Sequence, residues 1–132
     1  MQLLNKKLLD NLSEKAKASP RLRMNHNLHN HLDTPAQRLF NALEPGTVLP
    51  VHRHRQTDET YILVCGRLKV LLYNNAGLLI ESIELNLDDG NFGIHINAGQ
   101  WHTVEVLESG TVIFEVKDGP YTPLGKDDIL EI

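Results

Sequence analysis

The chain has 132 residues, a single-domain length, and its 13 basic and 17 acidic side chains give a net charge of −4. A mildly acidic chain without a long basic stripe fits a phosphate backbone poorly, so we expect no nucleic-acid partner. The apolar runs are too short to cross a bilayer and the N-terminus lacks a secretory apolar segment, so we expect no membrane partner. Cys65 is the only cysteine, which excludes an internal disulfide and fits a cytoplasmic location.

Residues 1–20 are predicted to hold one N-terminal α-helix. Leu4, Leu8 and Leu12 recur at every fourth position, the spacing that places side chains on one face of a helix over 3–18. Pro20 ends the pattern, because the residue before a proline avoids the α conformation. The apolar face indicates a helix that packs on the protein itself or on a second copy.

Residues 21–36 show neither helical nor strand periodicity and are rich in Asn and His. We predict an ordered loop that covers the following part of the chain. Arg21 or Arg23 would then bind a carboxylate or phosphate of a substrate, and His29 would contact the substrate or act as an acid or base. The alternative is that the arginines pair with surface acids and the histidines cap turns.

Residues 37–132 are predicted to form an all-β unit with a C-terminal tail. Short strand patterns alternate with turn signals, nearly all of which contain glycine, and no helix-length segment separates them. The absence of crossover helices argues against a parallel sheet and favours a sandwich or barrel. The predicted strands are 37–43, 47–52, 59–65, 67–73, 78–85, 92–96, 102–107 and 111–116.

Four residues of this unit form a candidate metal site. His52 and His54 are two residues apart in an extended segment, so both rings lie on one face. Glu59 begins the next predicted strand, and His102 begins a later one. Three imidazoles and one carboxylate suit a divalent transition metal, and we expect one ion of Fe, Mn, Ni or Zn.

The glycines around these ligands complete a motif. From Gly46 to Gly66 the chain reads Gly-x5-His-x-His-x4-Glu-x6-Gly, and Gly99-x2-His102 follows. This pattern resembles the two-part signature of the cupin superfamily, although Asn97 and Val106 replace the usual Pro and Asn of the second part. The resemblance implies a cupin fold, a small jelly-roll β-barrel, here with one N-terminal helix. Such barrels often pair, so we expect a homodimer.

A narrower resemblance covers residues 21–127. Arg21-x-Arg23-x-Asn25, the run from Gln37 to Gly46, and the stretch around Trp101-His102-Thr103 are similar to the WbuC family of cupin-fold metalloproteins. Members of that family often accompany polysaccharide-synthesis genes in bacteria. The resemblance implies a role in the metabolism of a sugar or sugar nucleotide and leaves the reaction open.

Strand alternation predicts what surrounds the metal. If Glu59 points into the barrel, so do Tyr61, Leu63 and Cys65, and the strand 111–116 would contribute Val112, Phe114 and Val116. Tyr61 would supply a hydroxyl that orients a substrate or transfers a proton, unless that hydroxyl only satisfies a partner in the core.

The leading hypothesis is a metal-binding cupin that acts on a small polar or anionic metabolite. If it is an enzyme, a metal-dependent isomerase, epimerase or oxygenase fits, with Tyr61, His29 and Glu59 as catalytic candidates. The first alternative is a non-catalytic cupin that senses or sequesters a ligand. The second is a structural zinc site closed by four protein ligands.

Overall fold

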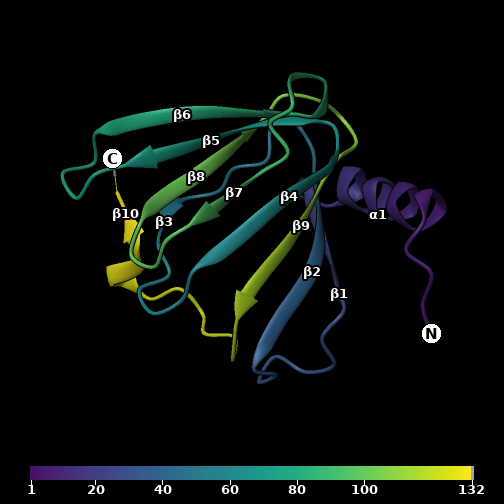
Figure 1. Cartoon of the computed structure of the whole chain (residues 1–132), viewed down its shortest axis with the longest axis horizontal. Helices are drawn as coiled ribbons and strands as arrows, with labels where there is room; N and C mark the ends of the chain where they lie inside the picture. Colours follow the sequence, from purple (N-terminus) through teal and green to yellow (C-terminus); the bar gives the residue numbers. More distant parts are fainter. Residues whose placement is uncertain (132) are drawn as a thin grey trace.

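Ten short strands form two antiparallel sheets in a computed structural model that describes residues 1–131. The first sheet has the order β1 (Arg23–Asn27), β2 (Ala36–Leu43), β9 (Thr111–Asp118), β4 (Glu59–Cys65) and β7 (Gly93–Ile96). The second has the order β10 (Ile129–Leu130), β3 (Val51–His52), β8 (Trp101–Val106), β5 (Arg67–Tyr73) and β6 (Leu79–Asn86). Figure 1 shows the two sheets facing each other, and the predicted all-β jelly roll with one helix is confirmed.

The main core lies between the two sheets. The first sheet contributes residues such as Leu43 and Ile113, and the second contributes Leu68, Val70 and Val106, all buried. Removal of this apolar surface from water is the chief stabilising term for such a sandwich. The packed interior fixes the spacing of the two sheets, and the candidate metal ligands lie on both.

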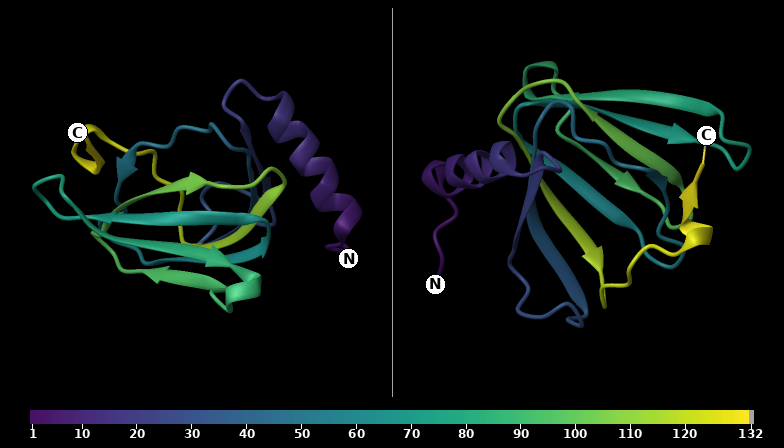
Figure 2. Two further views of the ribbon diagram at one scale, coloured as in Figure 1. Left: turned by 90° about the horizontal axis from the view of Figure 1, so that it is seen from above. Right: turned by 180° about the vertical axis from the view of Figure 1, so that it is seen from behind.

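Helix α1 (Lys6–Ala18) forms a separate layer against the outer face of the first sheet (Figure 2). Its first turn is capped by the side chain of Asn5, which accepts a hydrogen bond of 3.0 Å from the backbone N–H of Leu8. Leu12 and Ala16 are buried against Phe40 and other residues of β2 and β9. Within residues 1–131, no helix is long and apolar enough to cross a membrane.

The prediction of a loop over 21–36 is wrong for part of the segment, because β1 occupies Arg23–Asn27. This strand pairs antiparallel with β2, with Arg23 opposite Leu43. It lies at the edge of the sheet and all five of its side chains are partly or fully exposed, so it shows no apolar alternation that a sequence pattern could detect. Residues 28–35 connect β1 to β2 without a strand or helix.

The C-terminal tail folds back onto the second sheet, as an edge segment. Ile129 pairs with His52, and the backbone N–H of Arg53 donates to the carbonyl oxygen of Asp128 at 3.1 Å. A short 3₁₀ turn, Lys126–Asp128, precedes β10. The tail therefore pairs with the short strand β3, which carries a candidate metal ligand, and helps to hold it in place. The last residue of the predicted 37–132 unit, Ile132, lies outside the described residues.

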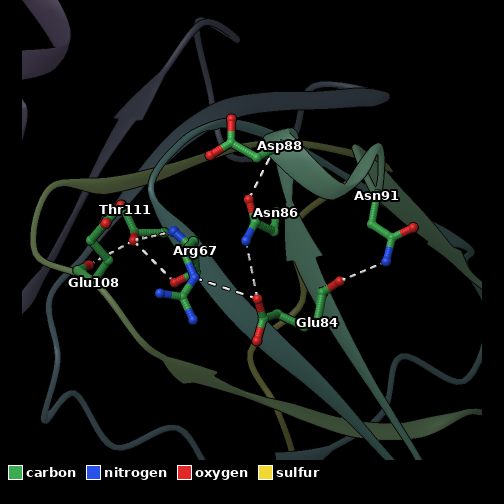
Figure 3. A network of polar contacts seen from close by, with 7 residues as sticks. All are labelled: Arg67, Glu84, Asn86, Asp88, Asn91, Glu108 and Thr111. Atoms are coloured by element: carbon green, nitrogen blue, oxygen red, sulfur yellow. Dashed lines mark hydrogen bonds and ion pairs between the residues drawn. The ribbon is translucent and has the colours of Figure 1, made fainter.

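A polar network closes the end of the barrel away from His102. Register along β5 shows the separation, since Leu72 is opposite His102 whereas Leu68 is opposite Val106. The side chain of Arg67 contacts that of Glu84 at 3.4 Å, and its backbone N–H donates to Thr111 Oγ1 at 3.1 Å (Figure 3). These bonds connect β5 to β6 and to the start of β9. The other members of the network are Asn86, Asp88, Asn91 and Glu108.

Candidate metal centre

Four side chains from separate elements converge at one end of the barrel. His52 lies in β3, His54 in the loop that follows, Glu59 at the start of β4, and His102 at the start of β8. One ligand atom from each lies within 4.8 Å of those from the other three. The sequence motif predicted this set. His102 and Glu59 are buried, and the other two are partly buried.

Hydrogen bonds to backbone carbonyls orient two of the three imidazoles. Nδ1 of His52 donates to the carbonyl oxygen of Pro50 at 2.9 Å, and Nδ1 of His102 donates to that of Gln100 at 2.9 Å. A carbonyl can only accept, so Nδ1 carries the proton in both rings. In a neutral ring Nε2 then offers a lone pair, and both residues present it in the form that a metal requires.

The contact between His102 and Glu59 needs a bridging proton or a metal ion. Nε2 of His102 lies 3.2 Å from Oε1 of Glu59, and both atoms are acceptors when the ring is neutral. Two buried acceptors face each other at this distance only if a proton, on the ring or on the carboxyl group, or a metal ion lies between them. Nε2 of His54 lies 3.3 Å from the other oxygen of Glu59. The donor set therefore fits a bound divalent ion.

Protonation states also favour a metal. Burial lowers the pKa of His52 to about 4, and the electrostatic interaction with His102 adds to this effect, so the His52 ring is neutral at neutral pH. Burial alone would raise the pKa of Glu59, but the close contacts with the His102 and His54 rings hold it well below its ordinary value. A neutral imidazole and an ionised carboxylate are the forms that bind metals.

Tyr61 points into the barrel, beside the candidate ligands. Its hydroxyl lies 3.3 Å from Nε2 of His102, and the residue is buried. Burial raises the pKa of the phenol well above its ordinary value, as does the nearby charge of Glu59, so the hydroxyl keeps its proton. Tyr61 is therefore a hydrogen-bond donor next to the candidate metal site.

The predicted interior face of β9 is wrong. Val112 and Phe114 pack with α1 on the outer face, whereas Ile113 belongs to the core between the sheets. By alternation, Glu115 also faces the interior, directly opposite Tyr61. Both faces of this strand are covered, so its apolar pattern does not reveal which face is inside.

Cys65 also differs from its predicted position. It packs with the cluster under α1, and its sulfur donates to the carbonyl oxygen of Gly110 at 3.3 Å. The register of β4 and β9 shifts between Leu63 and Cys65, and such a bulge breaks the alternation of faces. Leu63 remains in the main core, as predicted.

Sequence reasoning missed Glu115 and Asn41. Nδ2 of Asn41 donates to Oε1 of Glu115 at 3.0 Å. Burial and the charge of Glu59 raise the pKa of Glu115 to about 7. One sequence signal could have found Glu115, because it is a charged residue within the apolar run of β9. If Ile113 points inward, strand alternation places Glu115 on the same inner face.

A cavity of about 460 Å³ adjoins His54, one of the four candidate ligands. His54 lines it together with Arg55, Lys117 and the turn around Gly119 and Pro120. Arg55 pairs with Asp128 at 2.8 Å, so the C-terminal tail forms part of the wall. A small ligand in this cavity would contact His54, which connects the cavity with the metal site.

Three predicted ligand contacts lie elsewhere. Arg23 donates to Thr47 Oγ1 at 3.3 Å and to the carbonyl oxygen of Val48 at 3.1 Å. Arg21 is exposed, and Nδ1 of the buried His29 lies 3.1 Å from the backbone nitrogen of Arg38. The structure brings none of the three into the metal cluster or the cavity wall. Their role in substrate binding stays a prediction.

The two sheets and the four converging side chains define a cupin-fold protein with a candidate metal site. Solved structures share the fold. KdgF from a Halomonas species is 17% identical, with 79% of this chain and 84% of that chain covered and a TM-score of 0.61. A cupin-2 domain protein from Shewanella frigidimarina is 19% identical, with 73% and 80% covered and a TM-score of 0.55.

A third structure with this fold is the capsular polysaccharide assembling protein CapF from Staphylococcus aureus. It is 22% identical, with 69% of this chain and 25% of that chain covered and a TM-score of 0.55. At these identities the likeness establishes the fold alone. Residues 4–85 match the model of a family described as a domain of unknown function, DUF6016, and the chain belongs to that family. No curated protein matches the sequence.

Proposed function

We propose that this protein is a metal-dependent cupin that binds and converts a small polar or anionic metabolite. The observation that carries the proposal is the pair of facing acceptors, Nε2 of His102 and Oε1 of Glu59, held 3.2 Å apart. His52, His54, Glu59 and His102 would hold one divalent ion of Fe, Mn, Ni or Zn. A bound ion would polarise a substrate carbonyl or activate water or oxygen.

The residues around the ion have separate tasks. The cavity beside His54 admits the ligand, and Lys117 in its wall attracts an anionic group. Tyr61, whose phenol stays protonated, donates a hydrogen bond to the ligand or moves a proton at its oxygen. The apolar core next to Tyr61 limits access of water, which strengthens each polar contact.

We propose a sugar or sugar-nucleotide derivative of polysaccharide synthesis as the metabolite. Two likenesses support this class: the WbuC-like motifs of the sequence, and the fold shared with a capsular polysaccharide assembling protein. Isomerisation or epimerisation at a carbonyl, or oxygenation, is the proposed reaction. The expected cytoplasmic location and homodimer belong to the same proposal and stay predictions.

The test is a screen for turnover and binding. Protein loaded separately with each of the four metals is incubated with sugar nucleotides, sugar 1-phosphates and hexonates, and each mixture is followed by NMR. We expect conversion of one class by the loaded protein and none by a His52→Ala variant. Binding without conversion would favour a sensor or sequestering role instead. A protein that neither takes up metal nor binds any of these compounds would contradict the proposal.

A further inference from the structure

Asn41 and Glu115 form a polar pair inside an otherwise apolar part of the barrel. They lie on adjacent strands, β2 and β9, and each is two residues from a core residue, Leu43 and Ile113 respectively. Alternation places both side chains on the same inner face. Nδ2 of Asn41 donates to Oε1 of Glu115 at 3.0 Å. Neither residue belongs to the four candidate ligands.

The pair lies next to the candidate metal site. Glu115 is directly opposite Tyr61 in the β4–β9 pair, and the hydroxyl of Tyr61 reaches His102. Glu59 and His102 both interact electrostatically with the Glu115 carboxyl. A ligand bound to the metal next to Tyr61 would therefore meet Glu115 next.

The pair keeps hydrogen-bonding capacity that the protein itself does not use. Oδ1 of Asn41 is buried and accepts no hydrogen bond from residues 1–131. Among residues 1–131, no Lys, Arg or His side chain forms an ion pair with Glu115. Buried polar groups are nearly always satisfied, so an exception beside a candidate site calls for an explanation. Glu115 is half-buried, and a desolvated carboxyl without an ionic partner lowers stability, so the fold itself gains little from Glu115.

We propose that Asn41 and Glu115 are a subsite for the hydroxyl groups of a polyhydroxylated ligand bound at the metal. The inference rests on the proposed metal-dependent function and specifies its substrate class. A hydroxyl both donates and accepts, and the pair offers Oδ1 of Asn41 and the second oxygen of Glu115 to match it. A ligand with only carbonyl or phosphate oxygens would supply acceptors alone and would leave these two oxygens unpaired.

The experiment compares probes that share a carboxylate but differ in hydroxyls. Gluconate, galactonate and mannonate each carry a chain of hydroxyls, whereas hexanoate has the same number of carbons and none. Binding is measured by calorimetry with metal-loaded and metal-free protein, and metal content is checked afterwards. We expect at least one hexonate to bind at least about tenfold more tightly than hexanoate, the gain of a few hydrogen bonds.

Substitutions test whether Asn41 and Glu115 cause the preference for a hexonate over hexanoate. Glu115→Met and Asn41→Leu should each remove it and leave hexanoate binding unchanged. Glu115→Gln, whose amide oxygen can still accept from Asn41 and whose amide nitrogen can donate to a ligand hydroxyl, should retain most of it. Glu105→Met, at an exposed position of β8, is the matched control and should change nothing. Because Glu115 lacks an ionic partner, Glu115→Met should melt no lower than the wild type, whereas a structural role would lower its melting temperature.

The outcomes separate this inference from the proposed function. If the protein takes up metal but binds every hexonate no better than hexanoate, the subsite is overturned and the metal site stands. If a preference appears and survives both substitutions, the subsite is also overturned. If no metal is taken up, the proposed function fails. A hexonate preference in that protein that Glu115→Met removes would still support the subsite.

Discussion

His52 and His102 lie directly opposite each other in the β3–β8 pair, and their ring centroids are 4.4 Å apart. Each ring donates through Nδ1 to the carbonyl oxygen two residues before it. The same local hydrogen bond thus occurs on two strands that are far apart in the chain. Together they direct both Nε2 atoms toward Glu59 and His54, and this is the relationship on which the candidate metal site depends.

The site should lose its metal when His102 is removed. His102→Ala deletes a buried ligand, and we expect metal affinity to fall by more than about a hundredfold, since changes outside the ligand shell already cost roughly ten- to a hundredfold. The measurement is elemental analysis of protein purified without an affinity tag or chelator. His95→Ala is the matched control, because His95 is exposed and outside the cluster. Equal metal content in both variants would contradict the site.

Metal removal should lower the melting temperature. An ion at about a hundred times its dissociation constant stabilises the native state by about 2.7 kcal/mol, which corresponds to roughly 10 °C for a domain of this size. Thermal melts with and without chelator measure this shift. The His52→Ala variant should melt at the same temperature in both conditions. A chelator effect of equal size in that variant would show that the ion binds elsewhere.

Glu115 should make stability fall as pH rises. Its pKa is raised from 4.5 to about 7 in the folded protein, so between these values the native state holds a proton that the unfolded chain has lost. The stabilisation is complete below about pH 4.5 and disappears above about pH 7, a change on the order of 3 kcal/mol. Denaturant unfolding of wild type and Glu115→Gln at several pH values tests this. The free energy of unfolding of the variant, relative to that of the wild type, should increase up to pH 8. A difference that does not change with pH would contradict the raised pKa of Glu115.

Gly66 should tolerate no side chain. Its φ is +86°, and an added Cβ would lie 2.2 Å from Thr111 Oγ1 and 2.5 Å from Thr111 Cα. Gly66→Ala should therefore cost about 3 kcal/mol or more, because the clash involves backbone as well as a side chain. Gly90 has a similar φ of +79° but no atom within 4 Å of a Cβ, so Gly90→Ala should cost only about 1 kcal/mol. Equal losses in urea unfolding of the two variants would be evidence against the close approach of Thr111.

The sequence alone determined the all-β class, the strands β2 and β4 to β9, and the candidate ligand set. These features depend on local properties of the sequence. A turn is specified by the few residues that form it, and the ligands stand at fixed spacing in a motif. It also indicated the inward position of Tyr61, because β4 alternates regularly as far as Leu63. Local alternation is reliable where one face of a strand is buried and the other is not.

Only the tertiary structure decided the rest. The edge strand β1 exists because β2 supplies its hydrogen bonds, and no local pattern records that pairing. The inner face of β9 depends on α1, which covers the other face and makes Val112 and Phe114 look like core residues of the barrel. For the same reason the sequence pattern of β9 does not show that Glu115 faces inward, beside the candidate metal site. Which face of a doubly covered strand is inside follows from what packs on each side, and that is a long-range property of the chain.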